Sequence, residues 1–375
     1  MTITLNEFHA IIPAGGAGTR LWPISRASSP KFLKDLTGAG ASLLQQTVSR
    51  LAPLAGQNIM VVTGTTHIPS VVRQLPQLGE EQFIAEPSAR DSMAAIGLAA
   101  AIINQRYGDV VVGSFAADHL ISDPRKFEKA VSTAIDAANA GYVSTIGIQP
   151  QSPATGFGYI QADHELSAVP GSYAVTEFLE KPDIQTARSY VASGNYFWNA
   201  GMFVARADVL LTALEKYEPK LHAGIMSIAT AWDSDDREQV LDAHWPELKK
   251  IAIDHAIAEP LADDGGIAVV PADMGWTDIG DFSAVNEILQ DANSSPNAPT
   301  ITKRVVEGGT QQSVLSVEST NCTVFTYDRP ISLVGVNDVV VVDTGDALLV
   351  TSIAHAQNVK DVVEQVRATG RTDLV

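Results

Sequence analysis

The chain has 375 residues, 45% of them apolar, which is enough to bury the core of one large domain and a smaller one. Its formal net charge of −18 argues against a nucleic-acid-binding surface, because such surfaces concentrate lysine and arginine against phosphates. The longest apolar run, residues 93–103, is much shorter than the roughly 20 residues of a membrane span. The N-terminus has no basic residue ahead of its short apolar stretch and so lacks the charge pattern of a secretory signal, and we therefore expect a cytoplasmic protein.

Short apolar runs alternate with helix-like segments through the first 150 residues. The expected strands are residues 9–14, 58–63, 82–85, 109–115 and 143–148, and the expected helices are residues 42–51, 66–75, 92–107 and 124–140. This alternation is typical of a mainly parallel sheet that is covered on both faces. It predicts an α/β fold with a Rossmann-like, doubly wound mixed sheet, whose ligands lie beyond the carboxyl ends of the strands.

The pattern changes after residue 150. Strand-like segments are expected at residues 156–161, 173–179 and 197–205, helices between 209 and 258, and a linker at 291–299, which is rich in Asn, Ser, Pro and Ala. Short strands are then expected at residues 313–317, 322–326, 331–334, 339–342 and 347–350, with a final helix at 355–367. We therefore predict a catalytic domain over residues 1–292 and a small all-β module over residues 300–375, of solenoid or β-helix-like form, although no repeat is sharp enough to define.

A glycine-rich turn follows the first strand: residues 15–23 read Gly-Gly-Ala-Gly-Thr-Arg-Leu-Trp-Pro, and Lys31 follows behind Pro30. Glycine lets the backbone approach a ligand closely and aim its N–H groups at phosphate oxygens. The turn is neither a Walker loop nor a complete dinucleotide fingerprint, because the Gly-Lys-Ser/Thr and the third glycine are missing. The positive charges of the surrounding acid-free stretch, residues 8–34, are Arg20, Arg26, Lys31 and Lys34. We expect this stretch to receive phosphate oxygens, the alternative being a basic surface loop.

These residues resemble the signature of the sugar-nucleotide pyrophosphorylases, and residues 16–26 and 30–33 resemble more narrowly the mannose-1-phosphate guanylyltransferases. Further similar blocks follow in family order at residues 86–91, 117–119, 155–160, 178–182, 198–203 and 276–280, and residues 334–350 resemble the family's C-terminal end. The chain departs from the pattern at Asp91 (commonly Asn), at Ala200 (Ser) and at Asp281-Phe282 (Ser-Trp).

The resemblance implies an enzyme that transfers GMP from GTP to mannose 1-phosphate, giving GDP-mannose and pyrophosphate, with Mg²⁺ as cofactor. No nucleic acid or membrane partner is expected, and a homodimer is implied by the resemblance only. The alternatives are a pyrophosphorylase of the UDP-, dTDP- or ADP-glucose type, a catalytically silent nucleotide-sugar-binding regulatory relative, and a Rossmann oxidoreductase, which the missing glycine disfavours. Some family members append an isomerase domain, and the chain is expected to be too short to hold one.

The chemistry needs positioned charge rather than a general base, because the attacking sugar phosphate is already an anion. The residues expected to be catalytic are Arg20, Lys31, Asp118 and Asp278, with Lys31 at the α-phosphate and the two aspartates as Mg²⁺ ligands. The residues expected to bind the nucleotide are Ala14, Gly15, Gly16, Gly18, Thr19, Arg20, Glu86, Pro87, Arg90 and Ser92. The residues expected to bind the sugar phosphate are Gly158, Glu180, Lys181 and Asn199.

Structural roles compete with these assignments. Asp118 is equally explained from its position as a turn or cap residue, and Asp278 as the cap of a helix that begins near Asp281. Glu180 and Asn199 are residue types that usually lie on the surface. The segment 86–92 is placed to read the base, and its Asp91 either faces the base or caps the helix beginning at Ser92.

Other conspicuous residues have no necessary part in the chemistry. His9 and His119 are expected in core or capping roles. Trp198 and Trp276 either line the sugar pocket or pack against neighbours. Cys322 is the only cysteine, so the chain has no intrachain disulfide, and we expect a small buried side chain there. The β module is expected to carry no chemistry, because its candidates fall at expected turns: Asp328, Arg329, Asp338, Asp343 and Asp346.

Overall fold

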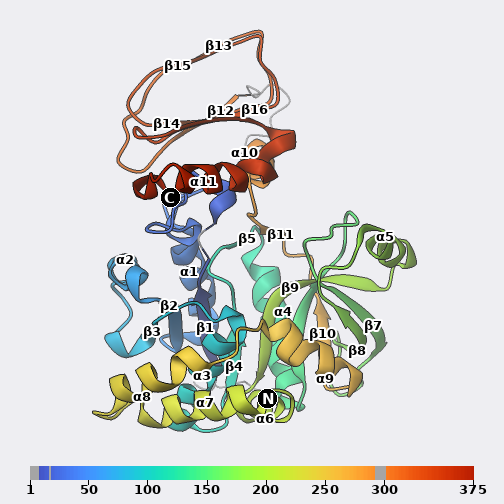
Figure 1. The fold of residues 1–375 in the computed structure, drawn as a ribbon. Coiled ribbons are helices and arrows are strands. Elements are labelled where there is room, and N and C mark those ends of the chain that lie inside the picture. Colours follow the sequence, from blue (N-terminus) through green and yellow to red (C-terminus); the bar gives the residue numbers. More distant parts are fainter. Residues whose placement is uncertain (1–7, 17, 292–300) are drawn as a thin grey trace. The chain divides into compact units, whose positions relative to one another are not determined.

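The computed structural model of the chain describes residues 8–16, 18–291 and 301–375 (Figure 1). Contacts divide the chain into two compact units. The sheet unit comprises the chain up to Gly15 together with Thr47–Ala117 and Ile121–Trp276. The β-helix unit comprises Gly16–Gln46, Asp118–Leu120 and Thr277–Val375. Most of the predicted linker lies outside the described residues, and the division into domains 1–292 and 300–375 stays a prediction.

The sheet unit is built on a nine-stranded mixed sheet in the order β3-β2-β1-β4-β9-β6-β10-β8-β7. The strands are β1 (Phe8–Ala14), β2 (Ile59–Gly64), β3 (Phe83–Glu86), β4 (Val111–Ser114), β6 (Val143–Ile148), β7 (Tyr159–Glu165), β8 (Tyr173–Leu179), β9 (Tyr196–Arg206) and β10 (Ile267–Pro271). Strands β1 to β4 pair in parallel, whereas β9 runs antiparallel to both β4 and β6. The predicted α/β class with a mixed sheet is confirmed.

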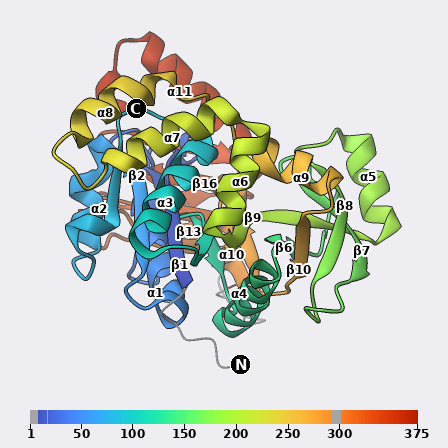
Figure 2. The same ribbon diagram turned by 90° about the horizontal axis from the view of Figure 1, so that it is seen from below.

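Helices cover both faces of this sheet, with α3, α6 and α7 on one side and α4 on the other (Figure 2). The helices between residues 43 and 263 are α1 (Leu43–Ala55), α2 (Ile68–Gln74), α3 (Asp91–Tyr107), α4 (Pro124–Asn139), α5 (Ile184–Ser193), α6 (Ala207–Tyr217), α7 (Pro219–Ala231), α8 (Arg237–His244) and α9 (Glu259–Asp263). The apolar run at residues 93–103 is the buried middle of α3, which packs between the sheet and its neighbouring helices. No described helix is both long enough and apolar enough to cross a membrane.

The C-terminal part of the β-helix unit consists of short strands stacked in coils, as predicted. Strands β12 (Ile301–Val305), β14 (Cys322–Thr326), β16 (Val339–Asp343) and β17 (Leu348–Ser352) form one sheet, and β13 (Val314–Val317) pairs with β15 (Ile331–Val334) in another. Strand β13 pairs with β15, and β14 with β16, at an offset of 17 residues, the same offset as in the bond from the Asn321 amide to Asp338, whereas β12 pairs with β14 at an offset of 21. Cys322 is fully buried between the coils, as expected.

A single apolar core connects the N-terminal and C-terminal segments of the β-helix unit. Leu21 and Trp22 share it with Phe325 and with Val363 of helix α11 (Val359–Ala368). Helix α10 (Phe282–Asp291) contributes further buried side chains. The segment that carries the glycine-rich turn is therefore packed against elements that lie some 300 residues further along the chain.

The pattern-based element assignment holds for most of the chain. The boundaries of β8, β14 and β15 agree with the prediction residue for residue. Strands β10 and β12 and helix α5 were not predicted, because their apolar runs are short and lie beside glycine, proline or the linker sequence.

Candidate active site

The glycine-rich turn has the backbone conformation that its glycines allow. Gly16 and Gly18 have φ angles of +85° and +60°, in the left-handed region that other residues rarely adopt. A Cβ atom on Gly18 would lie 2.8 Å from the Ser25 hydroxyl and 3.0 Å from the Cβ of Lys31, so the turn also depends on close packing. The neighbouring Arg20, in the 3₁₀ turn Thr19–Leu21, is exposed.

The Lys31 ammonium lies between two carboxylates of the β-helix unit. Its Nζ atom is 2.8 Å from Asp118 Oδ2 and 3.2 Å from Asp278 Oδ1, and it donates to the carbonyl of Ile279 at 3.1 Å. Asp118 directly precedes β5 (His119–Ile121), Asp278 ends β11 (Trp276–Asp278), and these two strands pair. Three residues from distant parts of the sequence, each predicted to be catalytic, are thereby brought together.

The charges at this centre stabilise one another. Burial would lower the pKa of the Lys31 ammonium, but Asp118 and Asp278 outweigh it, so that the pKa is raised. Burial would likewise raise the pKa of the Asp278 carboxyl, but Lys31, followed by His119 and Arg20, holds it below its ordinary value. At neutral pH, Lys31 is therefore cationic and Asp278 anionic.

The two aspartates have the donor chemistry that a hard divalent cation needs. Both present carboxylate oxygens to the same positive charge, and one or two carboxylates with substrate phosphates suffice for Mg²⁺. No group of three or more metal-type ligands occurs in the described part of the chain. The alternative role of Asp278 as a helix cap is wrong, because Asp281 caps α10 by accepting from the backbone N–H groups of Ser283 and Ala284.

In the sheet unit, Gly158 lies against two of the predicted sugar-binding residues. Its carbonyl accepts from the backbone N–H of Asn199 at 2.8 Å. A Cβ atom on Gly158 would lie only 2.4 Å from Glu180 Oε2, so the Glu180 carboxylate would have to move from its present position. Glu180 also accepts from the neighbouring Lys181 Nζ at 2.6 Å, which leaves the largely exposed Lys181 beside a mostly buried carboxylate.

The side-chain amide of Asn199 is fixed at both ends. Its oxygen accepts from the Thr145 hydroxyl and from the backbone N–H of Gly201, both at 3.0 Å. Its nitrogen donates to Asp254 Oδ1 at 2.7 Å. Burial of the Asp254 carboxyl, with a smaller contribution from the nearby Glu180 charge, raises the pKa of Asp254 to about 6.

Comparisons with known proteins agree with the geometry. The profile of the family "Nucleotidyl transferase" matches residues 9–295, and that of the "MannoseP isomerase/GMP-like beta-helix domain" matches residues 312–366. The xanthan biosynthesis protein XanB of Xanthomonas campestris pv. campestris (strain B100) is 37% identical over 98% of this chain and 75% of its own length. The mannose-1-phosphate guanylyltransferase of Escherichia coli (strain K12) is also 37% identical, with the same coverage of both chains. The chain belongs to the nucleotidyl transferase family, among the mannose-1-phosphate guanylyltransferases.

A solved structure extends this family likeness to the whole fold. The crystal structure described as mannose-1-phosphate geranyltransferase from Thermus thermophilus superimposes with a TM-score of 0.82 at 26% identity. The match covers 96% of this chain and 99% of the other. The resemblance read from the sequence motifs is thus confirmed, and the chain is an enzyme of the nucleotidyltransferase class.

The segment predicted to read the base, residues 86–92, is anchored by several bonds within the sheet unit. The Ser92 hydroxyl accepts from the backbone N–H of Ile253 at 2.9 Å, and Arg90 Nη1 donates to the carbonyl of Leu248 at 3.0 Å. Asp91 is exposed at the start of α3 with a φ of +58°, a conformation for which Asn and Asp are the common non-glycine residues. This explains why Asp can stand where the family commonly has Asn.

Glu86, at the end of β3, has a strongly shifted pKa. Desolvation by burial raises the pKa of its carboxyl to about 7. Its backbone carbonyl accepts from the Thr65 hydroxyl at 3.0 Å, which fixes the end of the strand. Pro87 follows directly and is exposed.

The structure shows how His9 and the two tryptophans of the site motifs, Trp198 and Trp276, are packed. His9 is buried, and burial lowers its pKa to about 4, consistent with the expected core role. Trp198 and Trp276 both pack on Phe157, with ring centroids 5.1 and 5.2 Å apart respectively. The buried indole N–H of Trp198 has no hydrogen-bond partner among the residues that the structure describes.

Sequence reasoning missed Asp254 and the partners of two basic residues. Asp254 lies in a π-helical turn, Asp254–Ala258. The sequence feature that could have identified it is that Asp254 is the one acidic residue in the mainly apolar stretch 251–258. Arg26 and Lys34, counted as charges for phosphate, instead pair with Asp346 and Glu307. The roles predicted for the remaining site residues stay predictions.

Proposed function

We propose that the protein transfers GMP from GTP to mannose 1-phosphate, releasing pyrophosphate and forming GDP-mannose. The observation that carries this proposal is the Lys31 ammonium held between Asp118 and Asp278 beside the glycine-rich turn. Cationic groups next to exposed backbone N–H groups are what a triphosphate needs. The names of the similar proteins, guanylyltransferases for mannose 1-phosphate, support the choice of substrates.

The triphosphate is proposed to bind the turn that begins at Ala14 and Gly15 and continues through Gly16, Gly18 and Thr19. Arg20 is exposed and so available to phosphate oxygens, and Lys31 is assigned to the α-phosphate. Asp118 and Asp278 are the residues that would hold Mg²⁺. Bound there, the ion would neutralise triphosphate charge as it does in other phosphoryl transfers.

The reaction itself needs no general base. An oxygen of the sugar phosphate attacks the α-phosphorus in line, a new P–O bond forms, and the bond to the β-phosphate breaks with release of pyrophosphate. The contribution of Arg20 and Lys31 is to stabilise the charge that develops on the α-phosphate and on the leaving group. Because both substrates are anions, this stabilisation is the main catalytic requirement.

Mannose 1-phosphate is proposed to bind the Gly158, Glu180, Lys181 and Asn199 group. Glu180 and the fixed amide of Asn199 offer hydrogen-bonding groups for sugar hydroxyls, and Lys181 is a cation for the phosphate. Asp254 is proposed to position Asn199. It accepts a hydrogen bond from the Asn199 amide nitrogen, and this bond fixes the orientation of the side-chain amide.

Guanine is proposed to be read by the segment from Glu86 to Ser92. The edge of guanine carries two neighbouring N–H donors, and an ionised Glu86 carboxylate is a matching acceptor. A buried acceptor left unpaired by another base costs binding energy, which is how such a site discriminates.

The test is a matrix of ATP, CTP, GTP, UTP and dTTP against the 1-phosphates of mannose, glucose, fucose and N-acetylglucosamine, scored by pyrophosphate release with Mg²⁺. We expect GTP with mannose 1-phosphate to have the highest kcat/KM by at least about tenfold, or roughly 1.4 kcal/mol. A higher value in another column would overturn the guanylyl assignment and favour a UDP-, dTDP- or ADP-sugar enzyme. Nucleotide binding without pyrophosphate release from any pair would identify a catalytically silent relative. A cytoplasmic location and a homodimer stay predictions.

A further inference from the structure

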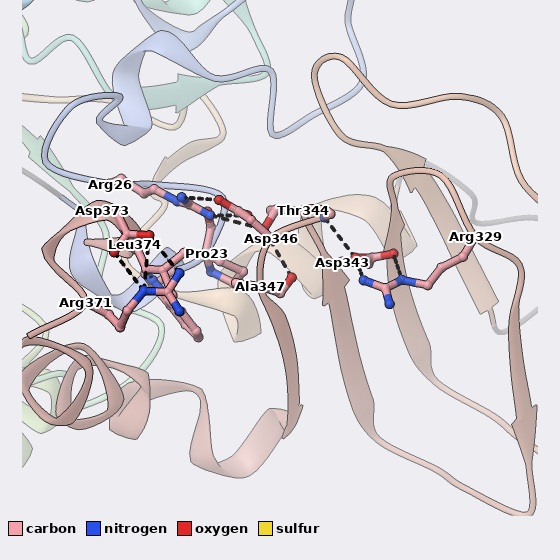
Figure 3. A network of polar contacts seen from close by, with 12 residues as sticks. Pro23, Arg26, Arg329, Asp343, Thr344, Asp346, Ala347, Arg371, Asp373 and Leu374 are labelled. Atoms are coloured by element: carbon pink, nitrogen blue, oxygen red, sulfur yellow. Dashed lines mark hydrogen bonds and ion pairs between the residues drawn. The ribbon is translucent and has the colours of Figure 1, made fainter. Parts of the chain in front are cut away.

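Arg26 lies in the stretch from Gly18 to Lys34, which carries the signature residues and which we call the signature segment. Its side chain is bound by the C-terminal β-helix rather than free for a ligand. Its Nη1 and Nη2 atoms donate to Asp346 Oδ2 and Oδ1 at 2.7 and 2.6 Å, a bidentate pair, and Nη2 also reaches the Thr344 hydroxyl at 3.2 Å (Figure 3). The Arg26 side chain is only 15% exposed. The hydrogen bond from Arg26 lowers the pKa of Asp346 to about 2, so the pair is ionised throughout the physiological range.

The turn that presents Asp346 has an internal support of its own. Asp343, which is fully buried, accepts from Arg329 Nε and Nη2 at 2.7 and 2.8 Å and from the backbone N–H of Gly345 at 3.0 Å (Figure 3). Thr344 closes the turn through the carbonyl of Ala347 at 3.1 Å. Asp346 lies at a turn, as expected, but its carboxylate points at the signature segment and accepts from Arg26.

Two further contacts hold the same segment from the C-terminal side. The indole N–H of Trp22 donates to the carbonyl of Leu374 at 2.7 Å, and the Trp22 ring is buried in the core shared with α11. Lys34 Nζ lies 2.9 Å from Glu307 Oε2. The attachments lie at both ends of the stretch from Trp22 to Lys34, which contains Lys31.

The attached stretch is compact and connects Arg26 with the glycine-rich turn. Arg26 and Ser29 exchange backbone hydrogen bonds, both at 3.0 Å, which folds the chain back on itself. Ser25, next to Arg26, lies within 2.8 Å of where a Cβ of Gly18 would be, and Lys31 packs on the same glycine. Arg26 is thus connected through its chain neighbour Ser25 to the close packing around Gly18 and Lys31.

We propose that Asp346 is a positioning residue for the nucleotidyl transfer, acting through Arg26 to hold the glycine-rich turn and Lys31 in their triphosphate-binding arrangement. The C-terminal β-helix is thus a part of the nucleotide site's support. This inference rests on the proposed function, because it takes the signature segment to be where the triphosphate binds. It adds that the residue that fixes this segment lies 320 residues further along the chain.

The test is Asp346→Asn, compared with Asp338→Asn as a matched control. Both changes remove one carboxylate charge from an exposed turn of the same β-helix, but Asp338 bonds to Asn321 within the β-helix itself. The measurements are the Kd for GTP with Mg²⁺ by equilibrium titration, the KM values for both substrates, and the Tm.

We expect Asp346→Asn to raise the Kd and KM for GTP about five- to tenfold, because a bidentate charged pair is lost, and to leave the KM for mannose 1-phosphate within about twofold. Asp338→Asn should leave all of these values unchanged. Arg26→Lys keeps the charge but loses the bidentate fork, so it should weaken GTP binding similarly, and the double variant should be no worse than either single one.

The inference is overturned if Asp346→Asn binds GTP as tightly as the parent, or if Asp346→Asn and Asp338→Asn weaken binding equally. Additive effects of Arg26→Lys and Asp346→Asn would also overturn it, since the two would then act independently. Should Asp346→Asn not fold, the Arg26→Lys variant alone decides by the same GTP measurement. A parent protein that binds GTP but releases no pyrophosphate from any substrate pair would instead refute the proposed function, and the Kd comparison would still test the positioning role.

Discussion

Replacement of either aspartate beside Lys31 by asparagine tests the proposed catalytic centre most directly. Asparagine keeps the size of the side chain and one oxygen that accepts from Lys31, but it removes the charge that a divalent ion needs. Loss of one such transition-state contact typically costs about 3–4 kcal/mol, which corresponds to a decrease in kcat of about 10²- to 10³-fold. Asp118 is both closer to Lys31 than Asp278 (2.8 against 3.2 Å) and less exposed (19% against 35%). We therefore expect Asp118→Asn to have the larger effect.

The assay is pyrophosphate release from GTP and mannose 1-phosphate over a range of Mg²⁺ concentrations. Both variants should need more Mg²⁺ for half-maximal rate, while circular dichroism and Tm show a folded protein. Asp273→Asn is the control, because Asp273 pairs only at the surface with Lys126 and is 89% exposed, so its kcat should change by less than about twofold. Near-normal kcat and Mg²⁺ dependence in Asp118→Asn or Asp278→Asn would refute the metal role of that residue.

Four further predictions concern Gly158, Glu86 and Asp254. Gly158→Ala places a Cβ within 2.4 Å of the carboxylate proposed to bind the sugar, so KM for mannose 1-phosphate should rise about tenfold, whereas Gly156→Ala, with nothing within 4 Å, should leave it unchanged. The Glu86 carboxyl, whose pKa is raised from 4.5 to about 7, is protonated below pH 7 and then lacks its acceptor charge. KM for GTP should therefore rise about tenfold from pH 8 to pH 6, and Glu86→Gln should abolish the difference. Because folding disfavours the ionised form of Glu86, its contribution to the free energy of unfolding is present below pH 4.5 and is lost as the pH rises through 7. Chemical denaturation should therefore find that the stability of Glu86→Gln, relative to the parent protein, is higher at pH 8 than at pH 4. Asp254→Ala should raise KM for mannose 1-phosphate at least about fivefold by leaving the Asn199 amide nitrogen without its acceptor, while Asp254→Asn should change it by less than about twofold in the same assay.

The local pattern of the sequence was sufficient for the elements and for the chemical type of the site. The alternation of short apolar runs with segments of helical periodicity indicated the α/β sheet, because strands that are buried on both faces are continuous runs of apolar residues. The β8, β14 and β15 boundaries followed from short apolar runs set between turn residues. The glycine-rich turn could be predicted for the same reason, because left-handed backbone at Gly16 and Gly18 requires glycine wherever the rest of the chain lies.

The 17-residue coil of the C-terminal strands could not be predicted because its repeat is structural rather than chemical. Thr320 and Asn321 stack on Asn337 and Asp338 one coil later, but few of the other residues in each coil are alike. Parallel pairing depends on backbone groups that every residue carries, so a β-helix can keep its register while its side chains vary.

Only the tertiary structure determines which charged side chains pair with one another. The sequence contains Arg26 and Lys31 as two cations in one acid-free stretch, and nothing local identified the carboxylates with which either would pair. The fold pairs Arg26 with Asp346 and sets Lys31 between Asp118 and Asp278, across separations of up to 320 residues. Electrostatic attraction acts between groups that packing has already brought close, and packing is a property of the whole chain. The sequence by itself therefore determined which groups were available to bind phosphate, and only the folded chain determined which of them are used to hold the protein together.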